Sequence, residues 1–116
     1  MAIYYHRAGD FENALQHYRA VLRRNELDAQ AHNNLGLLYQ ERHLLDESAR
    51  ELQRAIVIEP RNAAAHYNLA QLYDQTNQAA RAVHHYGRFL ENAAAEYASR
   101  VAAARVRIEV LTRDPD

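Results

Sequence analysis

Seven histidines are the residues in this chain best suited to hold a metal ion. Two ligands on one helical face need a spacing of about four residues, and a His-Glu-x-x-His motif would be the clearest sign of zinc. No two histidines have that spacing, and His84 and His85 are adjacent, so they would point about 100° apart on a helix. We therefore expect no metal site. His32 and His66 are expected to be packed structural side chains, and His17 and His85 to lie on the outer face of their helices.

Nucleophilic catalysis has few candidate residues. Cysteine is absent, and hydroxyl groups of the nucleophile type come only from the four residues Ser48, Thr76, Ser99 and Thr112. All 14 basic residues are arginine, which excludes a Schiff-base lysine or a phosphate-loop lysine within this chain. We predict no catalytic residues, no cofactor and no intrinsic enzyme activity.

Composition narrows the class of partner. The net charge of −1 provides no general attraction for nucleic acid or an anionic membrane. No apolar run approaches the roughly 20 residues of a membrane span, and the N-terminus is unlike a signal peptide. The sequence leaves the compartment unassigned, with the cytoplasm as the default expectation.

The same residue types return every 34 residues along the chain. The repeated positions include Tyr5, Tyr39 and Tyr73; Ala14, Ser48 and Ala82; Tyr18, Leu52 and Tyr86; and the pairs Leu35 and Leu69, His32 and His66, and Asn34 and Asn68. Self-similarity at this period is typical of a solenoid, in which stacked supersecondary units share one continuous core. This repeat predicts stacked helix pairs and favours binding over catalysis.

Apolar residues recur at steps of three and four, which predicts amphipathic helices. We expect helices at residues 1–8, 11–25, 29–42, 45–58, 63–76, 79–92 and 97–112. Gly9-Asp10 is expected to end one helix and cap the next, and Asp28 to cap the helix that follows it. Pro60 ends another helix, and Asn62 is placed to cap its successor.

Two consecutive units share a recognisable pattern. The unit that begins at Ala29 contains Leu35-Gly36, Tyr39, Ser48, Leu52, Ala55 and Pro60, and the unit from Ala63 contains Leu69-Ala70, Tyr73, Ala82 and Tyr86. At these positions the sequence resembles the tetratricopeptide repeat, a helix-turn-helix unit of 34 residues. The resemblance implies an all-α solenoid, a right-handed superhelix of about seven helices. It also implies a single domain over residues 1–116, with an N-terminally clipped repeat at 1–28, repeats at 29–62 and 63–96, and a C-terminal capping helix at 97–112.

Departures from the family pattern are informative at both ends of the chain. Phe89 stands where the family prefers alanine and Ala94 where it prefers proline, so residues 91–98 are expected to follow a different path. Val106 and Val110 lie off the main apolar stripe of the last helix and are expected to dock either a further repeat or another copy of the chain. The first unit lacks the start of its leading helix, which predicts a fragment of a longer protein.

The resemblance places the first helix of each pair on a concave binding face. The positions that usually point into this groove are Gln30, Asn33, Asn34, Leu37, Gln40 and Glu41 in one unit, Ala64, Tyr67, Asn68, Gln71, Asp74 and Gln75 in the next, and Ile3, His6 and Arg7 in the first. The lining is mostly amide and mildly acidic, and amides both donate to and accept from a peptide backbone. A clamp for a terminal carboxylate needs basic residues at these positions and is not predicted.

We therefore predict a non-catalytic scaffold that binds a peptide or a partner helix in this groove. Asn34 and Asn68 would hold the backbone, Leu37 and Tyr67 would give apolar contacts, and Glu41 and Asp74 would favour basic side chains. Asn33 and Gln71 complete the predicted binding residues. Two alternatives remain open. One is a self-assembly module that forms a homo-oligomer, and the other is a regulatory segment of a larger enzyme, such as a glycosyltransferase.

Overall fold

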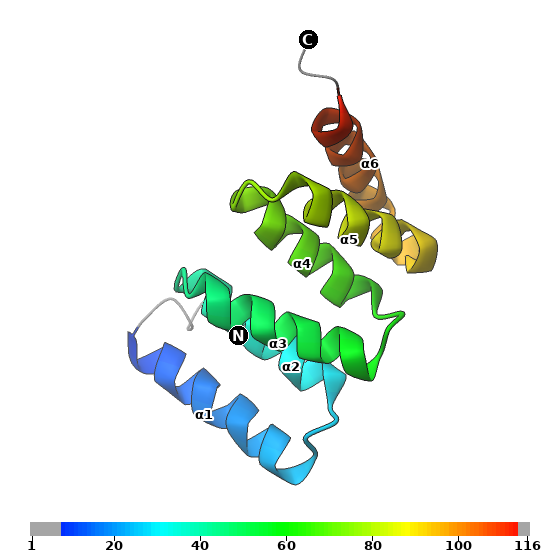
Figure 1. The fold of residues 1–116 in the computed structure, drawn as a ribbon. Helices are drawn as coiled ribbons and strands as arrows, with labels where there is room; N and C mark the ends of the chain where they lie inside the picture. The colour runs from blue at the N-terminus through cyan, green and yellow to red at the C-terminus, as the bar shows by residue number, and fades with distance from the viewer. Residues whose placement is uncertain (1–7, 114–116) are drawn as a thin grey trace. The chain divides into compact units, whose positions relative to one another are not determined.

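The computed structural model describes residues 8–113, and every regular element within that range is helical (Figure 1). The elements are α1 (Ala8–Arg24), α2 (Ala29–Glu41), α3 (Leu45–Ile58), α4 (Ala63–Gln75), α5 (Ala79–Asn92), the short 3-10 helix η2 (Ala95–Tyr97) and α6 (Ala98–Thr112). The all-α prediction is confirmed. The helix expected at 1–8 lies outside the described residues except for Ala8, which opens α1.

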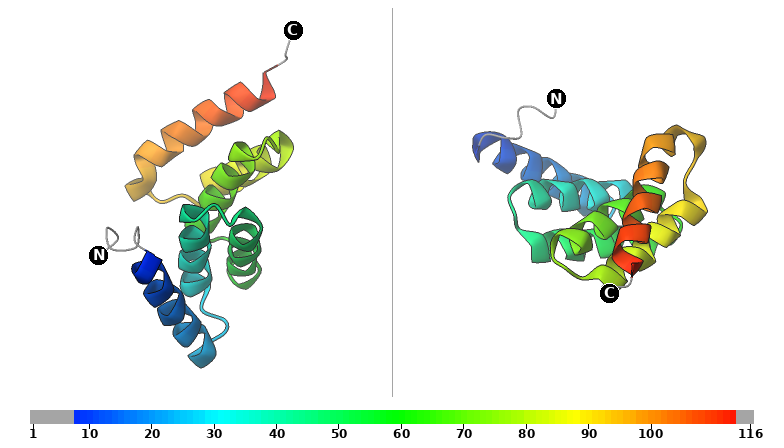
Figure 2. Two further views of the ribbon diagram at one scale, coloured as in Figure 1. Left: turned by 90° about the vertical axis from the view of Figure 1, so that its left-hand side faces the viewer. Right: turned by 90° about the horizontal axis from the view of Figure 1, so that it is seen from above.

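The chain divides into two compact units, Met1–Pro60 and Arg61–Asp116, at the break predicted around Pro60. In the first unit α2 packs against both α1 and α3. In the second, α5 packs against α4 on one side and α6 on the other (Figures 1 and 2). Each unit therefore contains one complete helix-turn-helix pair, α2 with α3 or α4 with α5, and one further helix.

Small and large apolar side chains alternate in the core of the first unit. Ala14 and Leu15 of α1 pack with Leu35 and Leu38 of α2. Between α2 and α3, Leu52 is fully buried. Ser48 is also fully buried, and its hydroxyl donates a hydrogen bond of 2.7 Å to the carbonyl of Gly36. The prediction that Ser48 occupies a buried small-residue position is confirmed.

Aromatic side chains dominate the core of the second unit. Phe89 is fully buried, and its ring centroid lies 4.8 Å from that of Tyr67 and 5.8 Å from that of Tyr97. Tyr86 adds an edge contact with Tyr67 at 6.0 Å. After α5 ends at Asn92, residues 93 and 94 are extended, and η2 then brings Tyr97 onto Phe89 before α6 begins. The expectation of an altered path here is confirmed.

Helix ends follow the 34-residue repeat. Asp28 caps α2 and Asn62 caps α4, and each side-chain oxygen accepts a hydrogen bond of 3.0 Å from the backbone amide three residues later. Both predicted caps are confirmed. The turns that leave α2 and α4 place His43 and Asn77 at positive φ, 59° and 61°. The left-handed conformation at both positions ends the first helix of the pair and allows the second to fold back.

The predicted break at Gly9-Asp10 is wrong. The helix α1 begins at Ala8 and includes both residues. Asp10 lies in the first turn, where a carboxylate favours the positive end of the helix dipole. A helix can start before a glycine because one glycine costs only about 1 kcal/mol of helix propensity.

Two glycines in helix interiors predict opposite responses to the same substitution. A Cβ atom at Gly36 would lie 2.7 Å from Cγ and 2.8 Å from Cδ2 of the buried Leu52, whereas at Gly87 it would meet nothing within 4 Å. We expect Gly36→Ala to lower the free energy of unfolding by roughly 1 kcal/mol, because overpacking outweighs the gain in helix propensity. Gly87→Ala is expected to raise it by about 0.5–1 kcal/mol. Urea unfolding followed by circular dichroism measures both, and two changes of the same sign would contradict the close approach at Gly36.

Candidate partner-binding surface

The predicted groove residues of α2 differ in how much of each side chain reaches the surface. Asn33 is buried, Asn34 and Leu37 are half-buried, and Glu41 is exposed in the last turn. These four residues share one helix, so Asn34, Leu37 and Glu41 fall close together along it at steps of three and four. The accessible members of these four are one amide, one aliphatic side chain and one carboxylate, and the exposed Gln30 and half-buried Gln40 add two amides from the same helix.

The predicted groove residues of α4 are more enclosed. Tyr67 is only 9% exposed, because Tyr86 and Phe89 pack against its ring and the guanidinium of Arg100 lies 5.5 Å from its centroid. Asn68 and Gln71 are half-buried. The amides of this helix are thus more available to a ligand than the tyrosine is.

Asp74 is already bound by residues of its own unit. Its carboxylate accepts two hydrogen bonds of 2.8 Å from Nε and Nη2 of Arg107 on α6, and one of 3.0 Å from the hydroxyl of Tyr86 on α5. The bond from Arg107 holds the pKa of Asp74 below its usual value, and burial raises the pKa of Tyr86. Asp74 thus joins three helices, and Arg107 was not among the predicted site residues.

Two buried histidines occupy the same place in successive helix pairs. His32 is hydrogen-bonded to two oxygens: its Nδ1 lies 2.7 Å from Oε1 of Glu51, and its Nε2 lies 2.9 Å from the carbonyl oxygen of Glu26. The carbonyl oxygen of Glu26 can only accept, so Nε2 of His32 is the donor in that contact. His66 instead faces His85, with 3.0 Å between their Nδ1 atoms. The expectation that His32 and His66 are packed and hydrogen-bonded is confirmed.

His85 does not lie on the outer face as predicted. Its ring is half-buried and stacks on His66 and Tyr73 of α4, with centroids 5.2 and 5.7 Å apart. Burial, followed by the nearby charges of His66, His84 and Arg88, lowers the pKa of His85 to about 4. His17, at the equivalent position of α1, is exposed as expected.

Metal and nucleophile chemistry gain no support from the described part of the chain. Within residues 8–113 no group of three or more histidine, aspartate or glutamate side chains is arranged to hold a metal ion. The hydroxyls of Ser48, Thr76 and Thr112 donate to backbone carbonyls. Among the same residues, none of the helices has the length and apolar character needed to span a membrane.

Solved structures of helical proteins resemble this fold closely. The Yersinia enterocolitica type III secretion chaperone SycD, crystallised with a peptide of the translocator YopD, matches with a TM-score of 0.82 at 17% identity, over 90% of this chain and 81% of that one. PcrH, in complex with the chaperone binding region of PopD, matches with a TM-score of 0.80 at 17% identity, over 90% and 80%. MamA matches with a TM-score of 0.68 at 19% identity, over 90% and 70%. At these identities the likeness concerns the fold.

Sequence comparison gives the family. No curated protein matches the chain. Models described as "Tetratricopeptide repeat" match residues 1–59 and residues 63–96, and a model described as "TPR repeat" matches residues 45–77. The first match alone spans half of the chain, and the match at residues 63–96 covers the helix pair of α4 and α5. The chain belongs to the tetratricopeptide repeat family.

Proposed function

We propose that this protein is a non-catalytic interaction module that holds an extended peptide of a partner protein along the first helices of its pairs. The observation that carries the proposal is the recurrence of a partly accessible asparagine, Asn34 on α2 and Asn68 on α4, on the helices that bind ligands in this family. Two of the structural neighbours were crystallised with a segment of another protein, SycD with a peptide of the translocator YopD and PcrH with the chaperone binding region of PopD, which supports a peptide as the ligand.

The chemistry of α2 suits a peptide backbone. The amide of Asn34 can donate to a carbonyl and accept from an N–H at once, and this pairing is independent of the ligand's sequence. Leu37, one turn away, offers an aliphatic contact, and the exposed Glu41 would attract a basic side chain near the end of the helix. Gln30 lies on the preceding turn and extends the polar surface.

The chemistry of α4 supports a narrower role for its residues. Asn68 keeps the predicted role of holding the backbone, and Gln71 adds a second half-buried amide to this surface. Asp74 would recruit a basic side chain only in competition with Arg107, whose two hydrogen bonds of 2.8 Å already satisfy both carboxylate oxygens. We therefore assign charge selection to Glu41, and Tyr67 would offer a ligand only the edge that its neighbours leave open.

The test is a pull-down from lysate of the source organism, with mass spectrometry and then affinity measurement on the recovered partner. We expect Asn34→Ala/Asn68→Ala to weaken binding by about fivefold to 150-fold, because each asparagine contributes about 0.5–1.5 kcal/mol of net hydrogen bonding. Asn13→Ala/Gln16→Ala, which removes two exposed amides from α1, is the matched control. Equal retention of the partner by both double variants would contradict the proposal, provided that thermal unfolding shows both to be folded.

A further inference from the structure

The first unit contains a cleft of about 960 Å³ that is separate from the residues of the proposed peptide surface. Its walls come from α1 and α3, and its base includes Leu35 and Tyr39 of α2. All of its lining residues lie between Arg19 and Ile58, so the first unit alone forms it. Asn34, Leu37 and Glu41 are absent from the lining.

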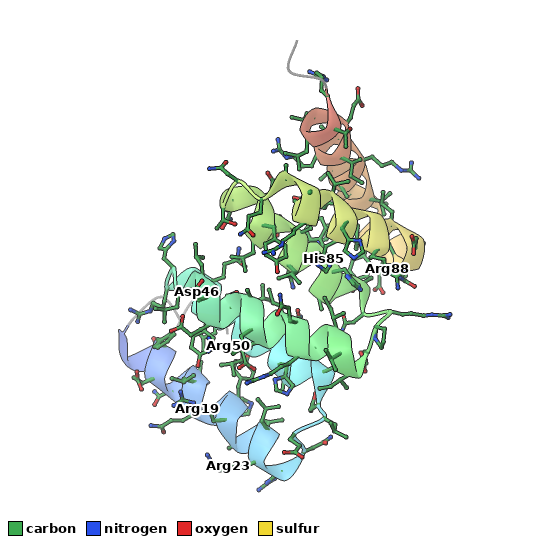
Figure 3. All side chains as sticks on the ribbon, in the orientation of Figure 1. Arg19, Arg23, Asp46, Arg50, His85 and Arg88 are labelled. Carbon is green, nitrogen blue, oxygen red and sulfur yellow. The ribbon has the colours of Figure 1, made fainter. Side chains whose placement is uncertain are left out.

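Four arginines surround this cleft. Arg19 and Arg23 stand one turn apart on α1, and Arg50 and Arg54 stand one turn apart on α3; Figure 3 labels the first three. Arg54 is held by Glu51 at 2.7 Å. In the part of the chain that the structure describes, the side chains of Arg19, Arg23 and Arg50 form neither salt bridges nor hydrogen bonds.

The lining of the cleft contains fewer carboxylates than arginines, and Asp46 and Glu47, one turn before Arg50 on α3, lie outside it. Two glutamates line the cleft, and Glu51 is buried, with one oxygen bonded to His32 and the other to Arg54. Glu26 is the exposed carboxylate of the lining. With Arg54 and Glu51 paired to each other, the three arginines Arg19, Arg23 and Arg50 face the single carboxylate of Glu26, so the lining has a positive excess although the whole chain carries a net charge of −1. The positive charge is therefore local to this cleft and favours an anionic ligand.

Aliphatic side chains give the cleft a second property. Leu27 is 68% exposed just after α1, and Val57 is 80% exposed near the end of α3. Both line the cleft, together with Leu22 and Ile58. Large aliphatic groups left this open to water favour a partner that covers them. Since α1 and α3 both run antiparallel to α2, their C-terminal ends place Leu27 and Val57 at the same end of the cleft.

We propose that this cleft binds an acidic segment of a partner protein, with an aliphatic or aromatic side chain seated between Leu27 and Val57 and carboxylates on Arg19, Arg23 and Arg50. Arginine presents a planar fork that pairs with a carboxylate through two parallel hydrogen bonds. The aliphatic end distinguishes this ligand from a nucleic acid, whose bases would call for aromatic side chains to stack on. Tyr39 is the one aromatic residue among those that line the cleft.

The experiment measures fluorescence anisotropy of a labelled synthetic peptide of aspartate and glutamate residues around a central Leu-Phe pair. We expect saturable binding by the intact chain. Replacing every aspartate and glutamate of the peptide by asparagine and glutamine is expected to weaken binding about tenfold, and high salt is expected to weaken it by a similar factor. Arg23→Glu is expected to weaken binding about tenfold, and Arg24→Glu less than about twofold. Arg24 is the matched control because it is the next residue of α1, is exposed and does not line the cleft.

A second variant tests the aliphatic end without touching charge. Val57→Ser is expected to weaken binding by about threefold to tenfold while leaving thermal unfolding unchanged, because the side chain is 80% exposed. Absence of saturable peptide binding, equal losses for Arg23→Glu and Arg24→Glu, or tighter binding of a labelled oligothymidylate would each overturn the proposal. Asn34→Ala is expected to leave the affinity for this peptide unchanged. The proposal for the cleft and the proposed function are therefore tested independently.

Discussion

Phe89→Ala is expected to lower the free energy of unfolding by about 3–5 kcal/mol. Phe89 is fully buried, and its ring contacts Tyr67 on α4 and Tyr97 at the start of α6. Truncation would leave a cavity where three elements meet, and Tyr97 would lose the contact that fixes the turn before α6. Denaturant unfolding followed by circular dichroism measures the loss, and hydrogen exchange is expected to show the amides of α6 opening first.

The family pattern makes this a decisive substitution, because alanine is the residue that the family prefers at this position. If the backbone could take the regular path of a repeat, Phe89→Ala would be close to neutral. We expect Phe89→Leu, which keeps most of the volume, to cost only about 1–1.5 kcal/mol. A loss under about 1 kcal/mol for Phe89→Ala would mean that the position of α6 does not depend on this ring.

The 34-residue repeat predicted the parts of the fold that local chemistry determines. Asp28 and Asn62 cap their helices as the sequence suggested, and Ser48 fills the small position beside Gly36. Such features need only a residue type at a known place in a helix. The left-handed turns at His43 and Asn77 also recur after 34 residues, but neither residue is a glycine, so the usual sign of such a turn was missing.

Features that depend on packing between helices could not be predicted from the sequence. The hydrogen bonds from Arg107 to Asp74 join residues 33 apart in the sequence. They could be predicted only if the position of α6 against α4 and α5 were known. The arginine cleft draws on three helices, so its charge is hidden in a chain of nearly neutral composition. A signal was present in the one-turn spacing of Arg19 with Arg23 and of Arg50 with Arg54, which places each pair on one helical face.

His85 shows how the repeat could have been used more fully. His32 and Glu51 are 19 residues apart, as are His66 and His85, so the two pairs occupy the same place in successive repeats. Recognising an acid–base pair at the first position would have placed His85 against His66 instead of on the outer face. The first repeat thus uses a histidine–carboxylate pair where the second uses two histidines, and the two should respond differently to acid.

Acidification from pH 6.5 to 4 is therefore expected to lower the free energy of unfolding by about 2 kcal/mol through His85. The pKa of His85 falls from 6.5 to about 4 on folding, so the unfolded chain binds more protons between these values and stability decreases as the pH falls. At the atomic level, one of the two facing Nδ1 atoms, 3.0 Å apart, must accept the hydrogen bond. Protonation of both rings places two N–H groups and two positive charges against each other.

His85→Glu tests this by giving the second repeat the pair found in the first. We expect the variant to lose most of the acid sensitivity between pH 6.5 and 4, because a carboxylate would accept from His66 as Glu51 does for His32. His17→Glu is the matched control, since His17 holds the same repeat position on α1 but is exposed.

The carboxylate of Asp74 does not contribute to the change in stability between pH 6.5 and 4. Its pKa is lowered from 3.8, so its contribution is present above that value and is lost only at lower pH. Denaturant unfolding at a series of pH values measures each variant, and parallel curves for the native chain and His85→Glu would show that the histidine pair does not set the acid response.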